Sequence, residues 1–260
     1  MTDQILPPHR FAELGSNFSI GNIFNRTFSI LTRNMLPFCM VTLVASLPHA
    51  LMDTARMGLD AARTGAVAPD INKAGLMLLF GGLGTMVLGA ISQAAILYGA
   101  FDDMRGRPVD LVVSLRVGLR RFFPLIGVVL LFIVFVMLSA IALLFPAFIV
   151  MAMLYVSVPA CVVERLGPIK SLGRSAQLTK GHRWKIFGLV FATIIVALLV
   201  QSMLGSMARA TGGPTLAIIV LLLWNTVWNA FQAILTVVTY HDLRVAKEGV
   251  DTDQIAAVFD

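Results

Sequence analysis

The residues that could perform catalysis or hold a metal ion are few in this chain, and they lie far apart. Four histidines occur in four different segments: His9, His49, His182 and His241. No two of them have the i, i+4 spacing of a metal-binding pair on a helix. Ser157 and Ser202 have neither a nearby base nor a nucleophile-elbow motif. Cys39 and Cys161 lie in apolar runs, which predicts free thiols. We therefore predict no catalytic residue, no metal and no cofactor.

Amide side chains inside apolar runs form a second group of interest. They are Gln93, Gln201, Asn225, Asn229 and Gln232. The last three recur at helical spacing and share one helix face. Amides in hydrocarbon need hydrogen-bond partners, so they either join helices or line a polar cavity for a headgroup or small solute. No charged residue accompanies them, which disfavours a proton or ion relay. The other two interpretations stay open.

A glycine-rich segment at 81–90, GGLGTMVLGA, superficially matches a dinucleotide-binding loop. It has no strand before it and no ribose-binding acid at the right distance, so the match is weak. Gly81, Thr85, Gly89 and Gln93 recur every four residues. This spacing predicts a stripe of small residues where another helix packs closely.

Basic residues gather in three short segments that precede long apolar runs. We expect contacts with anionic lipids from Arg26, Arg33, Arg116, Arg120, Arg121, Lys170, Arg174, Lys180, Arg183 and Lys185. A cation near a membrane surface attracts anionic headgroups with about 1 kcal/mol. This explains the formal net charge of +6 without a nucleic-acid partner.

The composition indicates a polytopic membrane protein. Hydrophobic residues make up 58% of the chain and charged residues 13%, whereas soluble proteins are about a quarter charged. The apolar runs predict six membrane spans, at 35–52, 76–100, 186–207 and 215–239, with two more in 122–163 joined by a turn near Pro146. The first span is interrupted by Pro37 and Pro48.

The elements that position the basic residues are three short amphipathic helices, expected at 19–33, 111–121 and 168–180. Ser19 and Asn34 are suitable ends for the first helix. Pro168 and Gly181 are suitable ends for the third, in which Ile169, Leu172 and Ala176 form the expected apolar face. The predicted fold is therefore all-α, with six transmembrane helices and three basic interfacial helices.

The distribution of cations predicts the orientation. Cytoplasmic loops of membrane proteins are enriched in Lys and Arg. The three basic segments, the polar leader 1–18 and the polar tail 245–260 should therefore be cytoplasmic, and an even number of spans places both termini there. Few cations fall on the opposite side: Arg56, Arg63, Lys73 and Arg209.

An internal repeat is the most informative pattern. FDDMR at 101–105 resembles YHDLR at 240–244, and a Gln-Ala pair precedes both at the same spacing. LTRN at 31–34 resembles LTKG at 178–181, and the middle unit retains only Glu164-Arg165 of the acidic motif. The 19–244 membrane domain thus divides into three parallel units, about 19–107, 108–167 and 168–244, each with a surface helix and two spans.

The segment 158–184 carries a resemblance to a known family. It reads VPACVVERLGP followed by S-L-G-R-S-x-x-L-T-K-G-H-R-W. This resembles the six-span membrane domain that accompanies some bacterial glycerophosphoryl diester phosphodiesterases, and related inner-membrane proteins of unknown function are also similar. The resemblance extends over about 18–244 and implies this fold and a location in the bacterial cytoplasmic membrane. In that family the phosphodiesterase activity belongs to a separate soluble barrel that this sequence does not contain, so it is not expected here.

Three functional classes follow from these observations. The first is a non-enzymatic membrane protein that interacts with lipids or with other membrane proteins in the bacterial envelope. The second is a transporter or lipid-translocating protein, with a cavity lined by Gln93, Asn225, Asn229 and Gln232. The third, an intramembrane enzyme, has no candidate nucleophile or metal site in this sequence.

Overall fold

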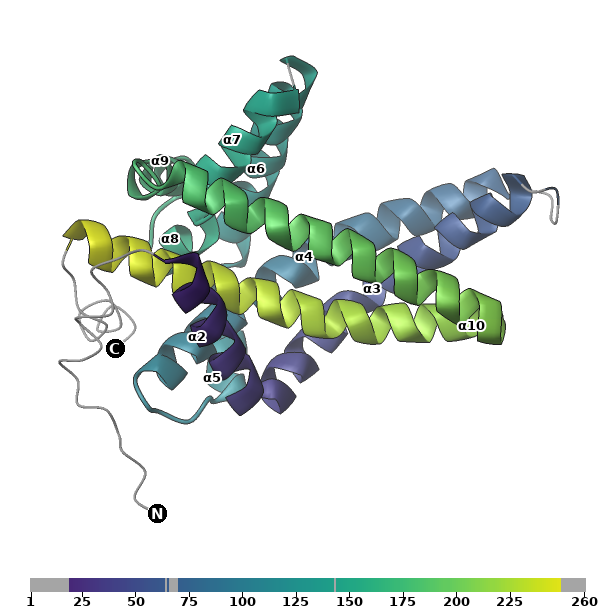
Figure 1. The fold of residues 1–260 in the computed structure, drawn as a ribbon, viewed down its shortest axis with the longest axis horizontal. Coiled ribbons are helices and arrows are strands. Elements are labelled where there is room, and N and C mark those ends of the chain that lie inside the picture. Colours follow the sequence, from purple (N-terminus) through teal and green to yellow (C-terminus); the bar gives the residue numbers. More distant parts are fainter. Residues whose placement is uncertain (1–18, 64, 66–69, 143, 249–260) are drawn as a thin grey trace.

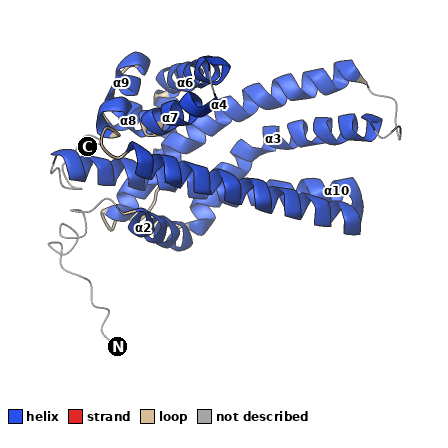
Figure 2. Ribbon diagram, turned by 45° about the horizontal axis from the view of Figure 1, so that its top comes forward, coloured by secondary structure: helices blue, strands red, loops and turns tan. Residues whose placement is uncertain are grey.

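The computed structural model describes residues 19–63, 65, 70–142 and 144–248 (Figure 1). The regular elements in this part of the chain are all helices, as Figure 2 shows, which confirms the all-α prediction. In chain order they are α2 (Ile20–Arg33), α3 (Met35–Arg63), α4 (Ile71–Met104), α5 (Leu111–Arg120), α6 (Phe122–Ala142), α7 (Leu144–Leu154), α8 (Ser157–Val163), α9 (Pro168–Leu178) and α10 (Arg183–Glu248). The predicted leader 1–18 and most of the tail lie outside the described residues.

Helix α10 consists of two antiparallel arms. The chain reverses at Gly213, whose φ of 73° is left-handed and therefore suits glycine. This is the turn expected between the last two spans. We call Arg183–Thr211 the first arm and Thr215–Glu248 the second arm.

The long helices form three hairpins: α3 with α4, α6 with α7, and the two arms of α10 (Figure 1). A short helix, α2, α5 or α9, precedes each hairpin. The tips of α3–α4 and α10 point the same way, whereas α6–α7 rises at a steep angle to both (Figures 1 and 2). The threefold relation between the units therefore stays a prediction.

Among the described residues, five helical segments are long and apolar enough to cross a membrane. They are Met35–Leu59, Ile71–Met104, Phe122–Ser139, Arg183–Thr211 and Thr215–Glu248. The fourth expected span, the second one within 122–163, is instead divided into α7 and α8 by a turn at Tyr155 and Val156. Pro159 explains this division, because it has no N–H to donate to the carbonyl of Tyr155 four residues earlier. The α6–α7 break also falls before Pro146, which lies in the first turn of α7, where proline is tolerated.

Helix α3 is longer than the span expected at 35–52, and its prolines do not end it. Pro37 lies in its first turn, and Pro48 is accommodated inside the continuous helix. Close contact with α4 stabilises this region: a Cβ on Gly81 would lie 2.8 Å from the carbonyl oxygen of Pro48, and one on Gly84 would meet the Pro48 ring. The predicted small-residue stripe thus contacts α3 at Gly81, whereas nothing lies within 4 Å of a Cβ at Gly89.

The short helices pack through small hydroxyl residues. In α2 the buried residues include Ile23, Thr27 and Leu31, as its amphipathic pattern predicts. In α9 the buried face contains Ser171 and Ser175, while Ile169 is 78% exposed. Of the apolar face expected for α9, Leu172 is thus buried against the protein, whereas Ile169 is not. The reason is that Ser175 and Thr179 both donate to the carbonyl of Met153, at 2.9 and 3.2 Å, which fixes the rotation of the helix.

Candidate functional site

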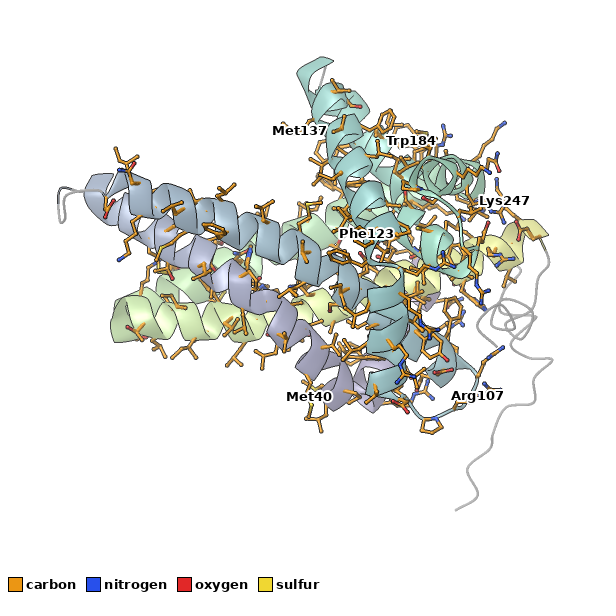
Figure 3. All side chains as sticks on the ribbon, turned by 180° about the vertical axis from the view of Figure 1, so that it is seen from behind. Met40, Arg107, Phe123, Met137, Trp184 and Lys247 are labelled. Carbon is orange, nitrogen blue, oxygen red and sulfur yellow. The ribbon has the colours of Figure 1, made fainter. Side chains whose placement is uncertain are left out.

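Charged side chains concentrate at one end of the molecule. Figure 3 shows nitrogen-bearing side chains gathered at the end that carries Arg107 and Lys247. The short helices α2, α5 and α9 lie at this end, away from the tips of the α3–α4 and α10 hairpins (Figure 1). We call it the basic end.

Two arginines of α2 bind the acids of the repeated motif. Arg26 donates to Asp242 at 2.6 Å, and Arg33 donates to Asp103 at 2.8 Å. Asn34 Nδ2 also donates to Asp103, at 2.6 Å. These bonds hold α2 against the ends of α4 and the second arm of α10.

A larger network joins α8, α9 and α10. Arg174 Nε donates to both oxygens of Glu164, at 2.7 and 2.8 Å, and its terminal nitrogen binds Glu248. Tyr240 donates to Glu164 at 3.0 Å, and Arg244 donates to Glu248 at 3.0 Å. Burial acts to lower the pKa of Arg174, but the hydrogen bonds and charges of the two glutamates outweigh it and raise the pKa. The guanidinium therefore remains charged.

No sequence pattern specifies these pairings, but two of the arginines share a local feature. Arg26 and Arg174 each directly precede a buried hydroxyl residue, Thr27 and Ser175. Each also binds an acid near the C-terminal end of a unit other than its own: Arg26 binds Asp242 and Arg174 binds Glu164. Arg26, Arg33 and Arg174 were expected to contact lipids, and the structure gives all three carboxylate partners within the protein.

Helix α5 presents a different surface. Its Asp110 cap accepts from the backbone N–H groups of Val112 and Val113. Gly118 allows one side of α5 to pack on α4, since a Cβ there would lie 2.8 Å from the carbonyl oxygen of Ile91. The other side leaves these residues exposed: Val112, Arg116, Leu119 and Arg120, followed by Phe123, which is 83% exposed.

The α9 helix and the turn after it carry the other exposed cations. Lys170, Lys180 and Lys185 are exposed, near Ile169 and Trp184, and Trp184 is 70% exposed. Gly181 in this turn has a φ of 91°, the left-handed conformation expected from the sequence.

Two further side chains near the turn are more enclosed. Arg183 is half-buried and donates to the carbonyl of Ala176 at 3.4 Å. The pKa of His182 is lowered by burial and by the charges of Lys185 and Lys247.

Three of the five predicted amides meet in one pocket. It has a volume of about 240 Å³ and is lined by Ala45, Thr85, Gly89, Ser92, Gln93, Asn229, Gln232, Ala233 and Thr236. We call it the amide pocket; it lies between α3, α4 and the second arm of α10. Asn229 Nδ2 donates to Ser46 Oγ at 3.2 Å, whereas Gln232 Oε1 and Thr85 Oγ1 are buried without a hydrogen-bond partner.

The other two amides do not line this pocket. Asn225 is buried on the second arm of α10, and its Nδ2 has no partner. Next to it, the carbonyl of Thr226 accepts from Thr42 of α3 at 2.8 Å, which joins the two helices. Gln201 lies on the first arm of α10.

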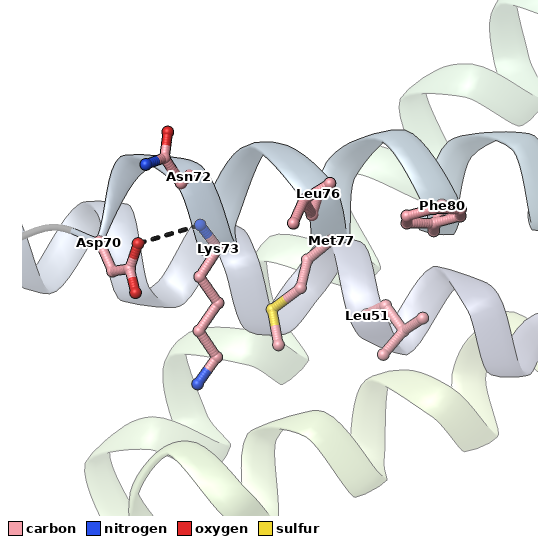
Figure 4. A pocket seen from close by; sticks show the side chains of 7 residues that line it. All are labelled: Leu51, Asp70, Asn72, Lys73, Leu76, Met77 and Phe80. Carbon is pink, nitrogen blue, oxygen red and sulfur yellow. Dashed lines mark hydrogen bonds between the residues drawn. The ribbon is translucent and has the colours of Figure 1, made fainter.

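A second, wider pocket of about 700 Å³ lies near the tip of the α3–α4 hairpin (Figure 4). Its polar residues are Asp70, Asn72 and Lys73. The Asp70 carboxylate accepts from the backbone N–H of Lys73 at 3.0 Å, so it acts as the cap of α4. Capping accounts for this carboxylate, and the lining residues other than these three are apolar.

Within the described part of the chain, no three His, Cys, Asp or Glu side chains lie together as metal ligands would.

Comparison with known proteins adds no family or function. The chain matches no known protein family, no curated protein and no solved structure.

Proposed function

We propose that this chain is a non-enzymatic integral membrane protein of the bacterial cytoplasmic membrane that binds anionic lipids through its basic end. The observation that carries the proposal is the exposed side of α5 with the first turn of α6, where Arg116 and Arg120 lie among Val112, Leu119 and Phe123. A helix with this mixture lies in the plane of a bilayer surface, its apolar groups below the headgroups and its cations among them.

Seven of the ten predicted lipid-binding cations fall into two groups. The guanidinium groups of Arg26, Arg33 and Arg174 bind carboxylates and hold the helices together. The exposed cations of α5, together with Lys170 and Lys180 around α9, are the ones that we assign to lipid headgroups. Partner membrane proteins could use the same surface.

We further propose that both termini are cytoplasmic and that the membrane is crossed an even number of times. The hairpin arrangement supports this, because each hairpin returns the chain toward the basic end (Figure 1). In this proposal α7 and α8, which include the apolar segment Ala147–Val163, together form the fourth of the six crossings. The repeat and the family resemblance described above agree with six crossings.

The lipid proposal is tested by replacing the α5 cations. Arg116→Gln combined with Arg120→Gln removes two charges at about 1 kcal/mol each, which lowers the affinity for an anionic headgroup about thirtyfold. The measurement is the ratio of phosphatidylglycerol to phosphatidylethanolamine that copurifies with the protein, relative to the source membrane, by mass spectrometry.

The matched control removes two charges from the hairpin tips, with Lys73→Gln and Arg209→Gln. We expect phosphatidylglycerol to be enriched on the unmodified protein and on the control, and this enrichment to be lost in the α5 variant. A wild-type ratio equal to that of the source membrane would disprove the proposal.

A transporter or lipid-translocating protein is the second candidate function. The gathering of Gln93, Asn229 and Gln232 in the amide pocket favours it. Transport requires that this pocket open to each side of the membrane in turn. A cysteine at position 229 that reacts with impermeant reagents from both sides would favour transport, and reaction from neither side would favour the first function.

A further inference from the structure

We infer that the amide pocket is a binding site for an uncharged, hydroxyl-rich group, such as a sugar. The site is separate from the basic end, and the inference does not rest on the lipid function proposed above. The polar groups that would bind the ligand are the amides of Gln93, Asn229 and Gln232 and the hydroxyl groups of Thr85, Ser92 and Thr236.

Two atoms in the pocket lack hydrogen bonds that a ligand could supply. Gln232 Oε1 is an acceptor, and Thr85 Oγ1 can donate or accept. Leaving a buried polar group unpaired costs about 1 to 3 kcal/mol. The hydroxyl groups of a ligand can donate to Gln232 and accept from Thr85, so a ligand with several of them can satisfy both atoms.

The lining also selects against charge. No Asp, Glu, Lys, Arg or His is among the residues that line the pocket. An ion would be transferred from water to this site without an opposite charge, which is strongly unfavourable. Amide groups, in contrast, can donate and accept at once, which matches neighbouring hydroxyl groups on a sugar ring.

The size of the pocket limits the group that enters. Its volume of about 240 Å³ equals that of about eight water molecules at about 30 Å³ each. This accommodates a single sugar ring. A whole lipid is too large, so only the headgroup of a lipid would occupy the pocket.

An aromatic row runs beside the amides on the second arm of α10. Trp224 stacks on Trp228 with ring centroids 5.2 Å apart, Trp228 on Phe231 at 5.5 Å, and Phe231 on Phe24 of α2 at 6.0 Å. All four rings are partly exposed. They provide an apolar surface, on the same arm as Asn229 and Gln232, for the hydrocarbon part of a lipid whose headgroup is bound.

The test measures binding of a neutral glycolipid, monoglucosyl diacylglycerol, to the full-length protein by native mass spectrometry. Phosphatidylcholine, which carries no hydroxyl group on its headgroup, is the reference lipid. Free glucose is tested separately through the shift that it causes in the melting temperature. Binding of the glycolipid alone identifies a lipid ligand, and a shift with glucose identifies a soluble one; both support the site.

Gln232→Leu and Gln93→Leu are the diagnostic variants, and Gln201→Leu, an amide outside the pocket, is the matched control. We expect each pocket variant to lower occupancy at least tenfold and the control to leave it unchanged. Gln232→Leu should still fold, because it removes an unpaired oxygen, and its unchanged melting temperature verifies this. No preference for the glycolipid over phosphatidylcholine together with no shift by glucose, or equal occupancy in Gln232→Leu, would overturn the inference and assign the pocket to water.

Discussion

Glu164 shows how one side chain can hold several helices together. It follows α8, accepts two hydrogen bonds from Arg174 of α9, and accepts a third from Tyr240 of α10. Hydrogen bonds to charged groups contribute about 1.5 to 3 kcal/mol each. A partly enclosed carboxylate with three such bonds fixes the position of α9, and with it the placement of the exposed cations around that helix.

His182, in the turn after α9, should make stability depend on pH. Its pKa in the folded protein lies below the ordinary value of 6.5, because burial, Lys185 and Lys247 disfavour its charged form. As the pH falls below about 6.5, the unfolded chain therefore binds more protons at this residue than the folded protein does. The free energy of unfolding decreases as the pH is lowered through this range. We expect a lower melting temperature at pH 5.5 than at pH 7.5.

The variant His182→Asn should reduce this difference in melting temperature. The remaining difference, from other titrating groups, is the baseline of the experiment. An identical pH dependence in the variant and the unmodified protein would show that His182 does not contribute.

The short helices are positioned by close backbone contacts as well as by ion pairs. We predict that Gly118→Ala destabilises the protein by about 1 to 3 kcal/mol. Its new Cβ would lie 2.8 Å from the carbonyl oxygen of Ile91, so α5 must move away from α4. The measurement is the melting temperature in detergent micelles.

Gly173→Ala in α9 is the control for this prediction, because nothing lies within 4 Å of a Cβ there. Alanine favours a helix over glycine by up to about 1 kcal/mol, so this change should be neutral or stabilising. If both variants lowered the melting temperature equally, the α4–α5 contact would not be the cause.

Elements set by local sequence were predictable, and elements set by distant contacts were not. The ends at Asn34 and Gly213 follow from residue type, and both were expected. The continuation of α3 to Arg63 was missed because 53–63 has no clear apolar periodicity. The burial of Ser175 could not be predicted, because the rotation of α9 depends on the Met153 carbonyl.

The same distinction applies to the candidate site. The shared face of Asn229 and Gln232 follows from helical spacing, but their meeting with Gln93 depends on how α4 packs against α10. The ion pairs of Arg26 and Arg174 join residues from different units, and no local pattern specifies such partners.

The whole molecule has a basic end and an opposite end formed by two hairpin tips (Figures 1 and 3). If the basic end is cytoplasmic, cysteines at the two ends must react from opposite sides of the membrane. We predict that Lys73→Cys is labelled by an impermeant maleimide in intact spheroplasts, whereas Lys170→Cys is labelled only after permeabilisation. Both positions are exposed.

These variants are made in a background with Cys39→Ala and Cys161→Ser, since serine can keep the bond that Cys161 donates to the carbonyl of Leu166. Labelling of Lys170→Cys in intact spheroplasts would reverse the proposed orientation.

The bond between Arg26 and Asp242 also constrains the order in which the protein is completed. The two residues are 216 positions apart in the chain. At a synthesis rate of about 5 to 20 residues per second, Asp242 leaves the ribosome about 10 to 40 s after Arg26. During that interval the Asp242 carboxylate is not yet available to Arg26. The guanidinium of the nascent chain must therefore stay among lipid headgroups or in water. The first described helix therefore reaches its final place only when the last one has been made.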